Sequence, residues 1–299
     1  MNHVQSKLHG LGVAMVTPFN NQGLVDFPAL QRLVELQHEQ GCGFLVILGT
    51  TGETPTLSAD ERRRVVDFVL EVNAGRLPVV VGVTGNDTRE LCERIATWSD
   101  EGISGFLVAS PAYNKPQQAG LVKHFEAVAD AAPRPVMLYN VPARTGSNMT
   151  AETTLMLAKH PNILGIKEAS GDLAQIARIL ADRPEQFGVW SGDDALALST
   201  IAMGADGVIS VAGNVLPERM AVMVQQAMFG QTNEAKNTHL AMAAFLELLF
   251  KEGNPAGVKA AMEHLNICSS NVRLPLVEAS ETLKGQLYQA IADMDVQVH

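Results

Sequence analysis

The chain has 299 residues, an apolar fraction of 46% and a formal net charge of −10. Its length exceeds that of most single domains but suits an α/β barrel, which takes about 250 residues before extensions. The acidic balance and the lack of a basic stripe argue against nucleic acid as a partner. No apolar run approaches the roughly 20 residues that span a bilayer, which argues against a membrane protein.

The cysteines bear on the compartment. There are three, Cys42, Cys92 and Cys268, and they are scattered without the spacing of a metal site. This usage is typical of reduced thiols in a cytoplasmic protein. Residues 1–10 contain no apolar core of signal-peptide length. We therefore expect a cytoplasmic protein.

Short runs rich in Val, Ile, Leu and Gly recur along the chain, each followed by a helix-like segment. Most are almost continuously apolar, as is typical of parallel strands covered on both faces. The eight expected strands cover residues 12–19, 43–49, 78–85, 105–111, 135–142, 163–170, 188–194 and 207–214.

Helix start signals stand between these runs. Ser58 and Asp87 each precede a glutamate by three residues, which is the spacing of a capping box. Thr150 and Asp172 are suited to cap two later helices. Pro217 suits the first position of a helix.

Eight strand–helix units without a linker predict one closed (β/α)8 barrel over residues 1–230. An open doubly wound sheet is the alternative, but no GxGxxG motif follows the first strand. Residues 231–299 predict a C-terminal helical extension packed on the barrel or on a neighbouring subunit. Within it, residues 235–250 are amphipathic, and Asn254–Pro255 resembles a cap and first-turn proline of a helix over residues 256–265.

One lysine stands apart from the others. Lys167 lies in an apolar, strand-like run, and burial of an ammonium disfavours its charged form. A neutral lysine can form a Schiff base with a carbonyl substrate. The alternative is a lysine that reaches solvent or pairs with Glu168. The other eight lysines stand in polar helix-like or loop-like contexts: Lys7, Lys115, Lys123, Lys159, Lys236, Lys251, Lys259 and Lys284.

Polar side chains follow several expected strands, at the barrel end where such folds carry their chemistry. Thr50 and Thr51 lie between glycines and can offer hydroxyls and backbone N–H groups to a carboxylate. Tyr113 and Tyr139 end adjacent strands and can move protons. Arg144 can bind a second carboxylate bidentately. The alternatives are a tight turn in which Thr51 caps the next helix, tyrosines that serve only in packing, and an arginine that is solvated.

Two features of the expected strand ends narrow the kinds of site and substrate. No histidine lies at an expected strand end, which argues against a metal site with imidazole ligands. Asp193 and Asp194 follow the seventh strand, where two carboxylates would repel a phosphate. We therefore expect no metal, and substrates that are small unphosphorylated acids.

Three segments together resemble the 4-hydroxy-tetrahydrodipicolinate synthase family, part of the pyruvate-dependent class I aldolase and lyase superfamily. The resemblance runs from about residue 10 to residue 217, in the same order and spacing. The three segments are residues 49–53, 139–146 and 165–172, and the tail also resembles the family at residues 254–259 and 273–276.

This resemblance implies a reaction. Lys167 would form an imine with pyruvate, and the derived enamine would attack the aldehyde of (S)-aspartate-4-semialdehyde to give 4-hydroxy-tetrahydrodipicolinate. That reaction is the first committed step of lysine and diaminopimelate biosynthesis. No metal or organic cofactor is required. The resemblance also implies a homotetramer built as a dimer of dimers.

The resemblance implies roles for the other candidate residues. Thr51, with Thr50, would hold the pyruvate carboxylate. Thr50 and Tyr139 would form a proton relay with Tyr113, which would reach in from a neighbouring subunit. Arg144 would bind the carboxylate of the semialdehyde. The backbone at two further positions would lie near the substrate: Gly192 and Ile209.

Sister enzymes define the alternatives. N-acetylneuraminate lyase usually has serine where Thr51 stands and has no arginine matching Arg144, and 2-keto-3-deoxy-sugar-acid aldolases diverge in the same loop. A non-catalytic barrel that binds pyruvate-like acids would need no nucleophilic lysine. The synthase reaction is therefore the preferred interpretation.

The resemblance also bears on regulation. Family members inhibited by lysine commonly have an aromatic residue just before the position of Tyr113 and histidines in the helix after the 49–53 turn. This chain has Ala112, Ala59 and Arg62 there, although Asn86 and Glu90 match. We therefore expect no feedback inhibition by lysine.

Overall fold

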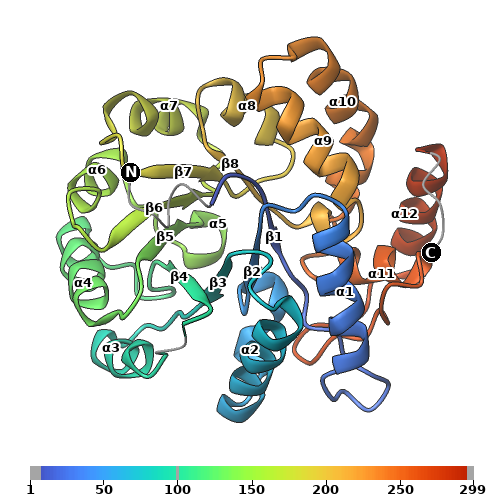
Figure 1. Ribbon diagram of the computed structural model, residues 1–299, viewed down its shortest axis with the longest axis horizontal. Helices are drawn as coiled ribbons and strands as arrows, with labels where there is room; N and C mark the ends of the chain where they lie inside the picture. The colour runs from blue at the N-terminus through green and yellow to red at the C-terminus, as the bar shows by residue number, and fades with distance from the viewer. Residues whose placement is uncertain (1–7, 99–100, 295–299) are drawn as a thin grey trace.

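A computed structural model describes residues 8–98 and 101–294, and within them eight parallel strands form a closed barrel. Each strand pairs with the next along the chain, and β1 closes the ring by pairing with β8. Figure 1 shows the helices around this ring. The expected (β/α)8 barrel is confirmed, and the open sheet is excluded. The strands are β1 Gly10–Ala14, β2 Phe44–Ile47, β3 Val79–Gly82, β4 Ile103–Ala109, β5 Val136–Asn140, β6 Ile163–Glu168, β7 Gly188–Ser191 and β8 Gly207–Ser210.

All eight strands end earlier than predicted, and after β1 and β8 a side chain takes a backbone hydrogen bond that would extend the ladder. The N–H of Val16 donates to Oδ1 of Asn214 at 3.1 Å, so β1 stops at Ala14 instead of residue 19. The chain after β8 turns into the short helix η4 (Ala212–Asn214), which a run of apolar letters does not distinguish from a strand.

Large side chains fill the lower part of the barrel interior. Phe44 and Trp190 are fully buried there, and the indole N–H of Trp190 donates to the carbonyl of Leu8 at 3.1 Å. Glycine makes this filling possible: a Cβ on Gly12 would lie 2.3 Å from the Phe44 ring, and one on Gly188 would lie 2.2 Å from Trp190. Because these side chains fill the barrel interior, the C-terminal ends of the strands are left as the place for a site.

The predicted helix starts are largely confirmed. Ser58 forms a reciprocal capping box with Glu61, and Thr150 and Asp172 cap the next helices along the chain. Asp87 caps its helix without the reciprocal bond, because the carboxylate of Glu90 is paired with Arg94. The barrel helices are α1 Phe27–Glu39, α2 Ala59–Asn73, α3 Thr88–Ala96, α4 Gln118–Ala131, α5 Pro142–Thr145, α6 Ala151–Leu157, α7 Leu173–Asp182, α8 Ala197–Ala202 and α9 Pro217–Met228, the last with Pro217 at its first position.

Three more helices follow: α10 (Thr232–Leu248), α11 (Ala256–His264) and α12 (Glu281–Asp293). α10 packs beside α9, and α11 and α12 pack on each other (Figure 1). The predicted capping role of Asn254 is wrong: Pro255 is the cap residue of α11, and the Asn254 amide donates to Oγ1 of Thr51 at 3.0 Å. None of the helices in the described ranges is long and apolar enough to cross a membrane. The domain boundary at residue 230 stays a prediction.

Candidate active site

Lys167 and Tyr139 face the same space from neighbouring strands. They are register partners in the β5–β6 pair, so both side chains point into the barrel. The Lys167 side chain is buried, and its Nζ lies 4.6 Å from the centre of the Tyr139 ring. The Lys167 amine makes no ion pair with any residue in the described part of the chain. The amine is therefore held by packing and left available to a ligand.

The room around Lys167 depends on Gly192, which follows β7. A Cβ at this position would lie 2.6 Å from the Cβ of Ala169 and 3.1 Å from Cε of Lys167. Any side chain at residue 192 would therefore displace the lysine.

A cavity of about 190 Å³ opens beside Lys167 at the C-terminal end of the barrel. A second cavity of about 420 Å³ adjoins it and shares Thr50, Tyr139, Arg144 and Asn254. Six of the eight residues expected at the site line the first cavity: Lys167, Tyr139, Thr50, Thr51, Arg144 and Gly192.

The turn after β2 carries the two threonines. It forms the short helix η2 (Thr50–Gly52), closed by the N–H of Glu53 on the carbonyl of Thr50 at 3.1 Å. Thr51 does not cap the following helix, since its hydroxyl accepts from Asn254. The capping alternative for Thr51 is therefore wrong, and the turn presents its threonines to the cavity.

Arg144 stands at the cavity edge on the single-turn helix α5. The N–H groups of Arg144 and Thr145 both donate to the carbonyl of Val141, and Gly146 ends the turn with φ of 79°. The Arg144 side chain is exposed and makes no ion pair with the described residues. Its guanidinium is therefore free to meet an anionic ligand.

Two of the expected residues lie away from the cavity. Ile209 is fully buried among the apolar side chains of the barrel interior. Tyr113 is 91% exposed, in a left-handed backbone conformation with φ of 75°, and its N–H donates to the carbonyl of Thr145. Within one subunit, the phenol of Tyr113 is not part of the site.

Glu168 does not pair with Lys167, because adjacent strand residues point to opposite faces. Its buried carboxylate accepts from the N–H of Ser170 at 2.7 Å, from the Asn140 amide at 3.1 Å and from Gln175 at 3.2 Å. Burial raises the pKa of the Glu168 carboxyl, and these hydrogen bonds oppose that rise. The alternative that Lys167 pairs with Glu168 is therefore wrong.

The two aspartates after β7 have separate positions. Asp193 lines the cavity, whereas Asp194 is buried and accepts from the N–H groups of Val211 and Ala212, both at 2.9 Å. Burial raises the pKa of the Asp194 carboxyl. The expectation that two carboxylates face a ligand is therefore wrong: only Asp193 does. In the described part of the chain, no cluster of His, Cys, Asp and Glu side chains could hold a metal ion.

Comparison with known proteins decides the family. The profile of the dihydrodipicolinate synthetase family matches residues 7–294. The chain belongs to this family. It is 46% identical to the 4-hydroxy-tetrahydrodipicolinate synthase of Azobacteroides pseudotrichonymphae, over 96% of this chain and 97% of that protein. It is 45% identical to the enzyme of that name from Koribacter versatilis, over 97% of both.

Solved structures of the family agree with the barrel. The dihydrodipicolinate synthase of Thermotoga maritima has a TM-score of 0.95 and 37% identity, covering 97% of this chain and 100% of that one. The chloride-inhibited enzyme of Acinetobacter baumannii, complexed with pyruvate, has a TM-score of 0.94 and 37% identity, with the same coverage.

In this member of the dihydrodipicolinate synthetase family, the sequence did not predict the positions of one group of residues from the C-terminal part of the chain. Phe250 and Asn254, from the C-terminal part of the chain, also line the cavity. Lys259, expected in a polar context, is fully buried. No local pattern could have placed Asn254 and Lys259, since each makes its contact with a turn about 200 positions earlier in the chain.

Proposed function

We propose that this lyase condenses pyruvate with (S)-aspartate-4-semialdehyde to form 4-hydroxy-tetrahydrodipicolinate, in lysine and diaminopimelate biosynthesis. The observation that carries the proposal is the unpaired amine of Lys167 facing a small cavity beside Tyr139. A cavity of about 190 Å³ lies below the roughly 300–1,000 Å³ of sites for larger ligands, which suits a three-carbon acid.

The first half of the reaction uses pyruvate. Nζ of Lys167 attacks the keto carbon, and water leaves as the protonated imine forms. The imine accepts the electron pair when the methyl group loses a proton, which gives an enamine. Thr50 and Thr51 hold the pyruvate carboxylate through hydroxyl and backbone donors, so that the keto carbon faces Lys167.

Proton transfer is the task of Tyr139. Its ring lies against Nζ of Lys167, and it shares the cavity with Thr50. In the proposed relay Tyr139 and Thr50 connect to Tyr113 of a second subunit, which links the buried amine to solvent.

The second half uses the semialdehyde, whose carboxylate binds Arg144 at the cavity edge. The enamine carbon attacks the aldehyde carbon, forming the new carbon–carbon bond. The amine of the bound semialdehyde then attacks the imine carbon and displaces Lys167, which closes the ring. Overall, the two substrates lose one water. The backbone at Gly192 and Ile209 is proposed to border the bound intermediate.

A side-by-side turnover assay tests the substrate assignment. We expect turnover of pyruvate with the semialdehyde and none of N-acetylneuraminate or 2-keto-3-deoxygluconate. Preferred cleavage of either sugar acid would instead identify a sister aldolase on the same scaffold.

The proposed role of Arg144 has its own test. Arg144→Ala should raise the KM for the semialdehyde by about 10- to 100-fold, as expected for the loss of charge-assisted hydrogen bonds. Formation of the pyruvate imine should change by less than about twofold. The control is Arg178→Ala, which removes an exposed arginine paired with Glu152 outside the cavity. Equal loss of both steps would contradict the role.

We further propose a cytoplasmic homotetramer, a dimer of dimers in which Tyr113 enters the neighbouring site. The 91% exposure of Tyr113 and its left-handed backbone support this, because an exposed aromatic held by a strained turn suits a partner contact. Sedimentation should give four subunits, and Tyr113→Phe should slow turnover. A monomer with full activity would exclude the shared site.

A further inference from the structure

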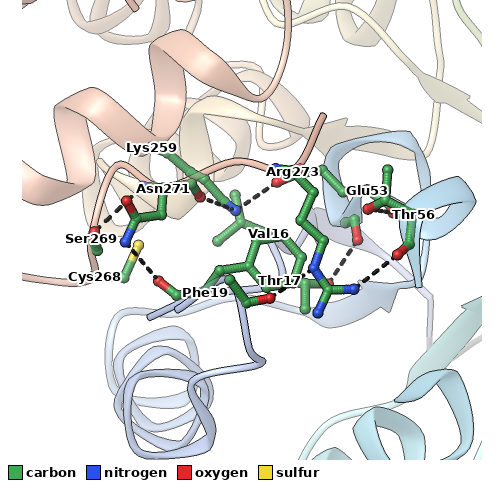
Figure 2. Close-up of polar contacts among 12 residues, drawn as sticks. Val16, Thr17, Phe19, Glu53, Thr56, Lys259, Cys268, Ser269, Asn271 and Arg273 are labelled. Atoms are coloured by element: carbon green, nitrogen blue, oxygen red, sulfur yellow. Dashed lines mark hydrogen bonds and ion pairs between the residues drawn. The ribbon is translucent and has the colours of Figure 1, made fainter. Parts of the chain in front are cut away.

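A buried ion pair connects the carboxylate-binding turn to the C-terminal part of the chain. Nζ of Lys259 on α11 donates to Oε1 of Glu53 at 2.6 Å, and neither side chain is exposed to solvent. The second carboxylate oxygen of Glu53 accepts from the N–H of Arg273 at 2.9 Å. Figure 2 shows these groups meeting from segments that are far apart in the sequence.

The amine of Lys259 is fully occupied. Besides Glu53, it donates to the carbonyl of Asn271 at 2.8 Å and lies 4.2 Å from the centre of the Phe19 ring. Burial lowers the pKa of Lys259, and the adjacent carboxylate of Glu53 opposes that change. Because its side chain is fully buried and lines neither cavity of the site, this lysine has no route to a carbonyl substrate there.

A buried ion pair is an inefficient way to obtain stability alone, because desolvation of the two charges offsets their attraction. What a buried ion pair does provide is a fixed position of its two side chains relative to each other. Glu53 ends the η2 turn in a left-handed conformation with φ of 52°, which a residue with a Cβ adopts only when its surroundings enforce it. The ion pair with Lys259 and the N–H of Arg273 hold both carboxylate oxygens of this residue.

Two further hydrogen bonds hold the same turn. The Asn254 amide, just before α11, donates to Oγ1 of Thr51, and the hydroxyl of Thr17 donates to the carbonyl of Gly52 at 2.8 Å. Three successive residues of the turn, Thr51, Gly52 and Glu53, are therefore each fixed from outside it.

We propose that Glu53 and Lys259 are positioning residues, which hold Thr50 and Thr51 at the distance from Lys167 that a bound 2-oxo acid requires. The inference rests on the proposed function, because the carboxylate that Thr50 and Thr51 hold belongs to the proposed substrate. Lys167 comes from β6, with which the pair shares no hydrogen bond or ion pair among the described residues, so substrate capture and imine chemistry should separate.

Three variants test the proposal. Glu53→Gln should raise the KM for pyruvate about tenfold, while the rate of borohydride-trapped imine at saturating pyruvate changes less than about threefold. Because this change leaves the Lys259 ammonium buried without its counter-ion, the double variant Glu53→Gln/Lys259→Met removes both charges together. It should fold and keep at least about a fivefold increase in KM.

Glu61→Gln is the matched control. Glu61 binds the guanidinium of Arg273 on the same C-terminal segment, and its hydrogen bonds in the described part of the chain go to Arg273 and Ser58 and not to the η2 turn. It should lower the melting temperature and leave the KM for pyruvate within about twofold of the parent value.

A double variant with the parent KM would overturn the positioning role, as would an equal increase in KM from Glu61→Gln. The parent protein separates this outcome from failure of the proposed function. If borohydride and pyruvate leave no adduct on Lys167 of the parent protein, the proposed function fails. If they do and the variants keep the parent KM, only the positioning role fails.

Discussion

Two lysines are buried in the described part of the chain, and they have opposite environments. Lys167 faces a cavity, touches the Tyr139 ring and makes no ion pair with the described residues. Lys259 is more deeply buried, yet a carboxylate, a carbonyl and an aromatic ring occupy its amine. Burial alone therefore does not make a lysine a nucleophile. An amine without a fixed partner, next to open space, is the distinguishing feature.

The largest expected effect separates the two lysines by chemistry. Lys167→Ala should reduce turnover about 10³-fold or more, because the imine has no other amine on which to form. Borohydride reduction with pyruvate should then leave no adduct by mass spectrometry. Lys259→Met should keep the adduct on the peptide that contains Lys167. An adduct on residue 259 of the parent protein would reverse the comparison.

The next largest effect distinguishes the two lysines by their contribution to the free energy of unfolding. Lys259→Met leaves the Glu53 carboxylate buried without its partner, which should cost about 3–5 kcal/mol of unfolding free energy in a urea titration. Lys167→Met removes a buried amine that has no ion-pair partner among the described residues, so unfolding free energy should stay within about 1 kcal/mol of the parent value or rise. Similar losses from both changes would contradict the view that only Lys259 is structural.

A third, intermediate effect concerns the ring over Lys167. Tyr139→Phe keeps the packing against Nζ but removes the phenol, so kcat should fall about 10²- to 10⁴-fold through lost proton transfer. The imine with pyruvate should still be trapped. A kcat near that of the parent protein would limit Tyr139 to packing.

The smallest effect concerns the ion pair between Glu61 and Arg273 of the C-terminal segment. The hydrogen-bonded Arg273 guanidinium lowers the pKa of Glu61 from 4.5 to about 2. Since the folded state favours the carboxylate, this stabilisation is present above pH 4.5 and is lost as the pH falls through 2. The side chains are partly exposed, so the contribution is about 1 kcal/mol. The stability gap between the parent protein and Glu61→Gln should close on acidification between these values, and a gap independent of pH would contradict the pairing.

Much of the architecture follows from local patterns. Continuous apolar runs separated by capped helices repeat eight times, and each run needs cover on both faces, which a closed barrel with outer helices provides. Lys167 could be recognised because a charge inside such a run is costly and thus conspicuous. Strand ends were predicted less well, since side chains such as Asn214 end the ladder from a distance.

The sequence by itself determined the barrel, the family resemblance and which strands or following turns carry Lys167, Tyr139 and the two threonines. Only the tertiary structure decided which polar residues share a cavity and which are occupied elsewhere. Lys259 looks like a solvated helix residue until Glu53, more than 200 positions earlier, is brought within 2.6 Å of its amine. The physical reason is that burial and pairing of a charge depend on contacts between distant segments, whereas strand and helix patterns depend on neighbours along the chain.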